Sequence, residues 1–376
     1  MKNNHIHIVS FDIPYPPNYG GVIDVYYCIE ALAKAGIAIT LHCSYKGALT
    51  RYPQLEKLCR EVYYYPRKTG ILAQLSLRPY GIRSRIEPIL LERLAQDEDP
   101  ILFEGLVSCL YLSHPSLANR KKIFRECNIE HDYYHGLARA SHSWWKTIFY
   151  HIEANRLKWY EPVIQHASSI AAVAHQDEQY FQRHYPNIPT AYIPSFHGQH
   201  DMQSMSGLGK YILYHGNLQL AENENAAMYI LKKIIPSLPD IQFIFAGKQP
   251  SPKLQAMASA LTNVTLIDTP DMPQMEQLIR DAHIHLLPTF QGTGLKLKLL
   301  NVLYNGRWVV VNPQMVHGTD VASLCHIGKS TEELIDWCRQ LSSIPFSDEE
   351  IQKRQRVLDD IYSDATNVQK LLQLLA

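Results

Sequence analysis

The sequence lacks the features that mark several large protein classes. Its 376 residues carry no formal net charge, which argues against a nucleic-acid-binding protein that relies on bulk positive charge. No apolar run approaches the roughly 20 residues needed to cross a bilayer, and the N-terminus enters a strand-like segment without a signal-peptide pattern. The seven cysteines are scattered without a CxxC pair, which is typical of a reduced, cytoplasmic protein. We find no short repeats or low-complexity tracts.

The chain does have enough apolar residues, 46%, for two hydrophobic cores, and its length favours two domains. Short apolar runs alternate with helical patterns, which predicts parallel sheets covered on both faces. The alternation stops in a polar stretch and then starts again. Strands are predicted over 5–11, 37–43, 61–65, 101–106, 121–127, 169–174 and 190–196, then over 211–218, 241–248, 264–268, 284–289 and 307–312. We therefore predict an α/β protein with an N-terminal domain over 1–196, a linker over 197–209, a second domain over 210–345 and a closing helix over 346–376.

Glycines and lysines follow the predicted strand 284–289 and precede a helical pattern. The stretch is QGTGLKLK, with Gly292, Thr293 and Gly294 ahead of Lys296 and Lys298. Ligands of open α/β sheets bind outside the carboxyl ends of the strands, and a helix N-terminus favours an anion there. An extended backbone would point both lysines to one side, whereas a helical one would turn only one toward a ligand. Taken alone, the pattern is equally typical of a glycine turn with solvated lysines.

A second glycine pair, Gly20 and Gly21, opens the helical pattern after the first predicted strand. It suits either a ligand-facing loop or simple close packing of helix on strand. Residues 51–93 hold nine Lys/Arg against four Glu, interleaved with leucines and isoleucines. Such a segment fits either a surface that rests on anionic lipid or a solvated helical face.

The whole chain resembles the GT-B glycosyltransferases, specifically the retaining family 4 of nucleotide-sugar-dependent enzymes. The N-terminal P-x4-GG is similar to that family's glycine loop. YHGNLQLAENENAAMYIL, FIFAGKQP and HIHLLPTFQGTGLKLKLLNVLYNGRWVVVN resemble, in order and spacing, the pieces of its C-terminal domain. The resemblance implies two Rossmann-like domains that face a central cleft, with the nucleotide sugar mainly on the C-terminal domain.

The resemblance also implies roles for individual residues. Gly216, Gly292, Thr293 and Gly294 would bring backbone close to the donor, and Lys296 and Lys298 would meet its diphosphate. The family usually carries glutamates where this chain has Asn301 and, often, Gln291, and a basic residue where it has Asn217. An amide can hydrogen-bond a hydroxyl but gives no charge-assisted bond.

Candidate catalytic groups lie in the predicted N-terminal domain. ECNIEHDYYHGLARA resembles the family's cleft-facing "HN-x-E" region, which places Glu130 and His131 near the donor sugar or the acceptor hydroxyl. Both residues are equally compatible with a helix cap and an exposed imidazole. Glu104 ends another predicted strand, as an acceptor-side carboxylate or a solvent-exposed edge charge. Asp24 suits the first turn of its helix through the helix dipole alone.

Histidines elsewhere allow a competing hypothesis. His131 and His135 have the i, i+4 spacing of a helical zinc site, but the sequence that follows shows no obvious third ligand. His197 and His200 fall in the linker, where we expect them to be solvated.

The resemblance thus implies a retaining hexosyltransferase that uses a nucleotide diphosphate sugar as donor, and we expect it to need no metal. The acceptor would be a hydroxyl of a glycan or lipid-linked molecule in cell-envelope polysaccharide synthesis. We expect no nucleic-acid partner and a cytoplasmic protein that touches the inner face of the membrane through 51–93. The alternatives are a nucleotide-sugar 2-epimerase and a catalytically silent GT-B subunit, the latter favoured by Asn301 and Gln291.

Overall fold

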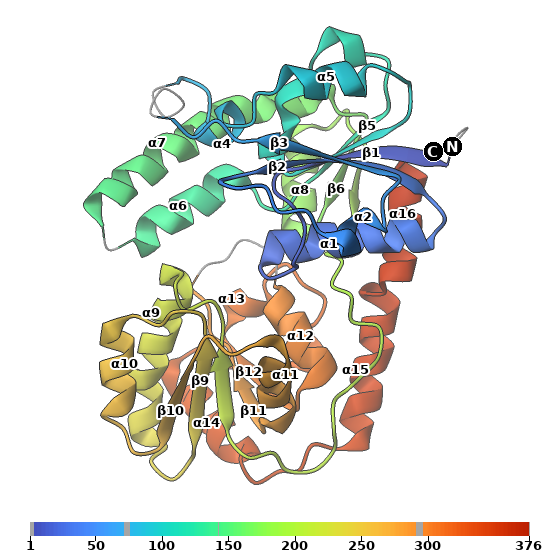
Figure 1. Ribbon diagram of the computed structural model, residues 1–376. Coiled ribbons are helices and arrows are strands. Elements are labelled where there is room, and N and C mark those ends of the chain that lie inside the picture. The colour runs from blue at the N-terminus through green and yellow to red at the C-terminus, as the bar shows by residue number, and fades with distance from the viewer. Residues whose placement is uncertain (1–3, 71–75, 142, 291–295, 376) are drawn as a thin grey trace.

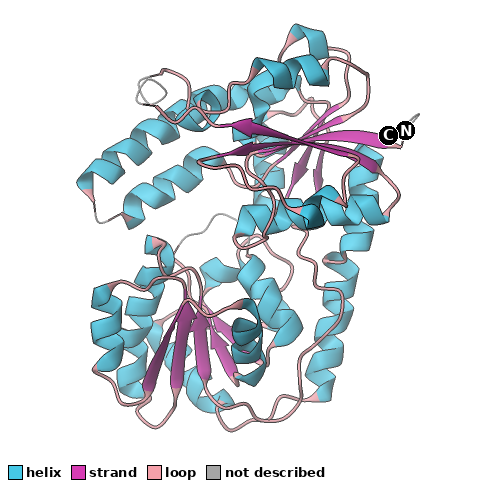
Figure 2. Cartoon of the chain, in the orientation of Figure 1, coloured by secondary structure: helices cyan, strands magenta, loops and turns pink. Residues whose placement is uncertain are grey.

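A computed structural model describes residues 4–70, 76–141, 143–290 and 296–375. The chain builds two parallel sheets in two bodies, drawn one above the other in Figure 1 and visible as two groups of magenta strands in Figure 2. This confirms the predicted α/β class with two Rossmann-like halves.

The first sheet has seven strands in the order β3-β2-β1-β4-β5-β6-β7, all parallel. The strand order moves outward from β1 in both directions, so the carboxyl ends of β1 and β4 meet at a topological switch point. The strands are β1 (His5–Ser10), β2 (Ala38–Tyr45), β3 (Glu61–Pro66), β4 (Ile101–Glu104), β5 (Lys122–Arg125), β6 (Ser169–Ala172) and β7 (Thr190–Tyr192).

Successive strand residues point to opposite faces, and both faces of this sheet are buried. Leu102 and Ile123 pack into one apolar cluster, whereas Phe103 and Phe124 pack into the other. The helices of this body are α1 (Gly20–Lys34), α2 (Pro53–Glu56), α4 (Tyr80–Arg83), α5 (Pro88–Leu94), α6 (Glu130–Ala140), α7 (Trp144–Tyr160) and α8 (His175–His184), with 3-10 turns η1 (Leu106–Tyr111), η2 (Pro115–Leu117) and η3 (Glu161–His166).

The second sheet has six parallel strands in the order β10-β9-β8-β11-β12-β13 and a single apolar core. Its strands are β8 (Ile212–His215), β9 (Phe243–Gly247), β10 (Val264–Asp268), β11 (Ile284–Leu286), β12 (Trp308–Val311) and β13 (His326–Ile327). Its helical segments are α9 (Ala221–Tyr229), η4 (Ile230–Ile234), η5 (Ile235–Ser237), α10 (Pro252–Ser259), α11 (Met272–Asp281), α12 (Leu297–Asn305), α13 (Pro313–Val316), η6 (Ala322–Leu324) and α14 (Thr331–Leu341).

The C-terminal segment predicted as one closing helix is two helices, α15 (Asp348–Ile361) and α16 (Asp364–Leu375). The helix breaks because Ser363 starts a new one, its hydroxyl accepting a hydrogen bond from the Thr366 amide at 3.3 Å. α15 contributes Leu358 to the core of the second body. α16 instead returns to the first body and packs against α1, as the red helix beside the blue one in Figure 1 shows.

The chain passes between the two bodies twice, at the start of the linker and between α15 and α16, and hydrogen bonds join these two segments. The carboxylate of Asp364 accepts hydrogen bonds from the backbone amides of His197 and Gly198, at 3.3 and 2.9 Å. His197 is 5% exposed, and its Nε2 donates to the carbonyl of Tyr362 at 2.7 Å. The expectation of a solvated His197 is therefore wrong, because the linker folds over the returning chain. His200 is exposed, as expected.

The structure also bears on the predicted strands, cysteines and membrane spans. Each of the twelve predicted strands is present with ends that differ by a few residues, and β13 was missed. All seven cysteines are free. None of the helices in the described ranges has the length and apolarity that a bilayer crossing requires.

Candidate functional site

A cavity of about 1240 Å³ opens between the two bodies, along the carboxyl ends of both sheets. Its walls come from the loop after β1, the start of α6, the linker, and the loops after β8, β9 and β10. The volume is sufficient for a ligand larger than a typical drug molecule.

On the C-terminal side, the strand ends bring backbone close to the cavity. A Cβ on Gly247 would lie 1.9 Å from the carbonyl oxygen of Gly216, so only glycine fits at the end of β9. A Cβ on Gly216 would lie 3.1 Å from the side chain of Asn223, which also lines the cavity. These glycines allow β8, β9 and the start of α9 to converge on one wall.

Lys296 and Lys298 both line this wall. Lys296 is the residue before α12, with non-helical backbone angles, while Lys298 lies in the first turn. The turn from irregular backbone to helix is what allows both side chains to face the cavity. Nζ of Lys298 donates to Oδ1 of Asn223 at 3.0 Å. Burial lowers the pKa of each lysine to about 8, although the negative charge of Glu222 opposes that shift.

Glu222 is a cavity residue that the sequence analysis missed. It lies in the first turn of α9 and lines the same wall as the lysines. Burial raises the pKa of its carboxyl, and the charges of Lys298 and Lys296 act in the opposite direction. A local signal existed, since Glu222 opens the helix after the Gly216 loop, but its approach to lysines more than 70 residues away is a tertiary contact.

Asn301 also lines the cavity, one turn along α12 from Leu297. Its Oδ1 accepts a hydrogen bond from Nδ2 of Asn305 at 2.8 Å, and the same Nδ2 lies 3.1 Å from Oε1 of Gln199 in the linker. The side-chain amide of Asn301 is thus held in place by the side-chain amide of Asn305. Gln291, Gly292, Thr293 and Gly294 lie outside the described residues.

The glycine pair at the start of α1 lines the opposite wall. A Cβ on Gly21 would lie 2.8 Å from the ring of Phe11, so glycine lets this ring pack closely against α1. Gly20 has no atom within 4 Å of that position. Close packing explains Gly21, and the lack of a Cβ at Gly20 keeps this wall open to a ligand.

Glu130 begins α6 and lines the cavity. Burial raises the pKa of its carboxyl to about 7, against the opposing charge of Arg85. A carboxyl with a pKa near neutrality can hold or release a proton at working pH.

His131 is adjacent in sequence but is not part of the cavity wall. It is 6% exposed, and its Nδ1 lies 3.0 Å from Oε2 of Glu161. Its placement beside the reacting sugar is therefore not supported, because consecutive helix residues point in directions about 100° apart. His135 lies against the His151 ring, 5.5 Å between centroids, and neither histidine joins a metal-compatible group in the described ranges. The zinc-hydrolase hypothesis has no structural support.

Glu104 does not line the cavity either, which corrects its assignment as an acceptor-side carboxylate. It is fully buried, with Oε2 3.4 Å from Nη1 of Arg125. Arg125 also binds Asp24 through both terminal nitrogens, with Nη2 2.8 Å from Oδ1. Two buried carboxylates therefore share one arginine, and Asp24 also accepts the Phe196 amide at 2.6 Å. The triad joins β4, β5, α1 and Phe196, the residue before the linker.

Some arginines of the basic segment 51–93 make contacts within the first body, whereas the sequence analysis placed this segment on the surface. Arg67 and Arg85 line the cavity. Arg85 donates from Nε to the Phe11 carbonyl at 2.8 Å and from Nη1 to the Gly81 carbonyl at 2.7 Å, and burial lowers its pKa to about 10. Arg93 lies over the ring of Tyr63 at 3.8 Å. Segment composition did not distinguish these inward-facing arginines from the exposed Arg60 and Arg78.

No protein-family model matches the chain. A curated relative, an uncharacterized 44.6 kDa protein in the cps region of Klebsiella pneumoniae, is 26% identical over 321 residues, which cover 81% of each chain.

Solved structures match over nearly the whole length. A variant of TarM from S. aureus, in complex with fondaparinux, α-GlcNAc-glycerol and UDP, aligns with a TM-score of 0.68, 10% identity and 100% of both chains. A UDP-forming α,α-trehalose-phosphate synthase from Burkholderia xenovorans, in complex with glucose-6-phosphate, aligns with a TM-score of 0.61, 10% identity and 99% of each chain. At these identities the likeness establishes the fold, and the chain has the GT-B fold of glycosyltransferases.

Proposed function

We propose that this GT-B chain is a retaining hexosyltransferase, which transfers a sugar from a nucleotide diphosphate sugar to a hydroxyl of a glycan or lipid-linked acceptor. The observation that carries the proposal is the pair of lysines, Lys296 and Lys298, on one wall of the cavity between the two bodies. The opposite wall holds Glu130 and Arg85.

The lysines suit the leaving group. When the bond between the anomeric carbon and the diphosphate breaks, negative charge develops on the phosphate oxygens. Two ammonium groups beside the start of α12 would stabilise that charge more strongly in the transition state than in the ground state. Burial lowers the pKa of each lysine to about 8, and the negative charge of a diphosphate beside them would favour the charged form. We propose that this arrangement needs no metal, so added Mg²⁺ would leave the rate unchanged.

Glu130 suits the acceptor side. Its pKa of about 7 allows it to accept a proton from an acceptor hydroxyl. Closure of the two bodies would exclude water and so favour transfer over hydrolysis.

The neighbours support the substrate class. One of the solved structures is a complex with UDP, another is a UDP-forming synthase, and the curated relative lies in a cps region. On the basis of these similarities, we extend the proposal to a role in cell-envelope polysaccharide synthesis. Contact with the inner face of the membrane through 51–93 stays part of the proposal, now limited to its exposed residues, such as Leu77, which is 95% exposed, and Arg78.

The first test is a thermal-shift screen with UDP, GDP, ADP and their common sugars. A ligand that binds the folded state raises the melting temperature. We expect a shift with one nucleotide that is lost in Lys298→Ala and kept in Lys253→Ala, a control in the same body whose side chain is exposed. A shift that survives Lys298→Ala would contradict the placement of the diphosphate.

A catalytically silent, nucleotide-binding subunit is the second candidate, and Asn301 is the observation that favours it. Glu222 favours an active enzyme, because it is a carboxylate in the donor wall that can bond a sugar or ribose hydroxyl. We expect transfer activity in the wild type and about a tenfold gain in donor affinity in Asn301→Glu, from a charge-assisted bond. Binding without turnover in both proteins would identify the silent subunit. Release of free nucleotide without any acceptor would indicate the 2-epimerase.

A further inference from the structure

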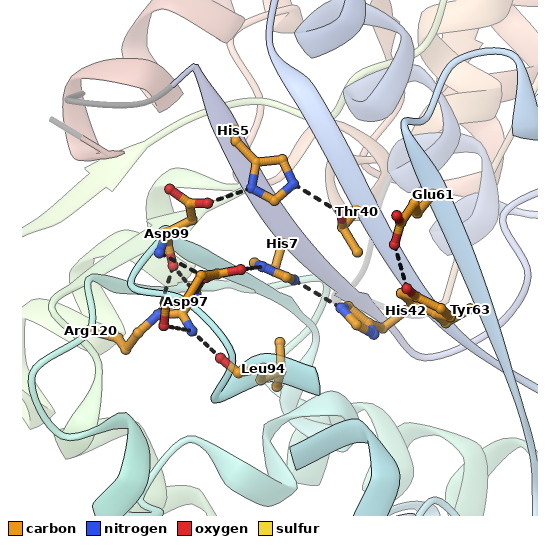
Figure 3. Close-up of polar contacts among 10 residues, drawn as sticks. All are labelled: His5, His7, Thr40, His42, Glu61, Tyr63, Leu94, Asp97, Asp99 and Arg120. Carbon is orange, nitrogen blue, oxygen red and sulfur yellow. Dashed lines mark hydrogen bonds and ion pairs between the residues drawn. The ribbon is translucent and has the colours of Figure 1, made fainter. Parts of the chain in front are cut away.

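Four metal-ligating side chains lie together at the amino end of the first sheet, on the opposite edge from the cavity. Figure 3 shows His5 and His7 from β1 pointing toward Asp97 and Asp99, which precede β4. One ligand atom from each of the four residues lies within 4.8 Å of all the others. We propose that this cluster, the His5–Asp99 site, binds one Zn²⁺ ion that fastens the start of β1 to the loop before β4.

The backbone explains why the four side chains converge. His5 and His7 are two apart on a strand, so both point to the same face. Asp97 and Asp99 are also two apart, in the loop between α5 and β4, and Oδ1 of Asp97 accepts the Asp99 amide at 2.9 Å. β1 pairs with β4 along His7 and Ile101, which brings the loop beside the two histidines.

The donor set fits zinc. Two imidazole nitrogens and two carboxylate oxygens complete a tetrahedral site with no open position, which is the pattern of a structural zinc site. Nδ1 of His5 faces Oδ2 of Asp99 at 2.6 Å, and Nε2 of His7 faces Oδ2 of Asp97 at 2.9 Å. The four ligands need only small side-chain shifts to place their donor atoms about 2 Å from a common centre.

The other nitrogen of each histidine has its own partner. Nε2 of His5 lies 2.9 Å from the hydroxyl of Thr40, and Nδ1 of His7 lies 3.0 Å from Nε2 of His42. His42 in turn lies 2.8 Å from the hydroxyl of Tyr65. Nε2 of His5 can donate to the Thr40 hydroxyl, and Nδ1 of His7 can donate to Nε2 of His42, whose own Nδ1 donates to the Tyr65 hydroxyl. The other nitrogen of each ligand histidine then carries a lone pair that can bind a metal. Partners of this kind orient the ligands of zinc sites.

Charge and access also favour a cation. Arg120 pairs with Oδ1 of Asp97 at 2.9 Å, which leaves one net negative charge among the two aspartates and the arginine. The guanidinium also donates to the backbone carbonyls of Leu94, Asp97 and Asp99, so the loop is held in place without a metal. The Asp97 side chain is 35% exposed, and an ion can enter from that side.

The test uses the full chain without a histidine tag, dialysed against chelator and then titrated with Zn²⁺ alone. We expect one Zn²⁺ per chain by equilibrium dialysis and a melting temperature that rises with Zn²⁺. Co²⁺ at the same site should give the intense visible absorption of tetrahedral coordination.

Two variants remove one ligand each with little change in shape, Asp99→Asn and His5→Gln. Each should weaken Zn²⁺ binding by at least about a hundredfold and abolish the thermal shift. His175→Gln is the matched control, because His175 pairs with the carboxylates of Asp320 at 3.1 Å and Glu178 at 3.4 Å but is not part of the His5–Asp99 site. It should bind Zn²⁺ as the wild type does.

The metal-free melting temperature of each variant separates loss of the site from loss of the fold, since both variants keep a hydrogen-bonding side chain. Binding at less than one Zn²⁺ per chain, or equal binding in the wild type and Asp99→Asn, would overturn the proposal. Nucleotide binding in the distant cavity should be unchanged in both variants, so this test is independent of the proposed function.

Discussion

Glu130 is the residue whose chemistry depends most on its surroundings. Burial raises the pKa of its carboxyl from the ordinary 4.5 to about 7. Between these two values the folded chain holds a proton that the unfolded chain has released. Stability therefore falls as pH rises through this window and levels off above pH 7.

Glu130→Gln removes this pH dependence. We expect the variant to gain stability relative to the wild type as pH rises from about 4.5 to 7, on the order of 3 kcal/mol, and to lose transfer activity by about 10²–10⁴-fold. Chemical denaturation across pH measures the first effect, and initial rates measure the second. Asp132→Asn, exposed on the same helix, serves as control. Equal rates in Glu130→Gln and the wild type would remove Glu130 from the reaction.

Some of the candidate site residues line the cavity and others do not. Lys296, Lys298 and Asn301 follow a parallel strand, so topology alone directs them to the carboxyl edge. Glu104 also ends a strand, but it forms a buried ion pair with Arg125, 21 residues later in the sequence. Arg85 and Glu222 were missed because burial against the opposite wall is decided by contacts far along the chain.

At the scale of elements, α16 belongs to one body by packing and to the other by sequence. Its Val368, Leu371 and Leu375 join the core around α1 and the first sheet. A helix with an apolar stripe must bury it, but the stripe does not specify against which body. The apolar periodicity of 346–376 gives no sign that the chain crosses from one body to the other. The sequence therefore predicts a single closing helix.

Leu371→Ala should therefore destabilise the first body. The side chain is fully buried, and its truncation should cost about 2–5 kcal/mol. Denaturant unfolding with and without nucleotide measures the loss. The exposed neighbour Gln373→Ala should change stability little. A Leu371→Ala variant as stable as the wild type would contradict the docking of α16.

Strands were easier to predict than this helix. Runs such as IHLLPT and RWVVVN are apolar on both faces, as a doubly covered parallel strand requires. Their ends moved by a few residues because sheet pairing, and not composition, decides where a ladder stops. β13 has only two residues, His326 and Ile327, and is too short to leave a pattern.

At the scale of the whole molecule, the restart of the alternation after residue 210 was enough to predict two bodies. The domain boundaries stay a prediction. One contact across the bodies is polar, with Nε2 of His175 in α8 3.1 Å from Oδ1 of Asp320. Polar, partly exposed contacts of this kind cost little to break, so the bodies can move.

We expect the matching nucleotide sugar to draw the two bodies together. Small-angle scattering should show a smaller radius of gyration with ligand, because the diphosphate adds contacts to both walls of the cavity. Lys298→Ala should stay at the ligand-free value. A radius that is unchanged in the wild type under saturating ligand would show that closure is not part of the reaction.

The crossing at Asp364 and His197 has a mechanical consequence. A single flexible tether would let one body twist and slide in any direction relative to the other. Here two chain segments run abreast and are bonded to each other. Two attachments side by side resist twisting and leave one easy rotation, about the line that joins them. The motion that opens the cavity then has, to a first approximation, one degree of freedom, and each opening and closing repeats the same path.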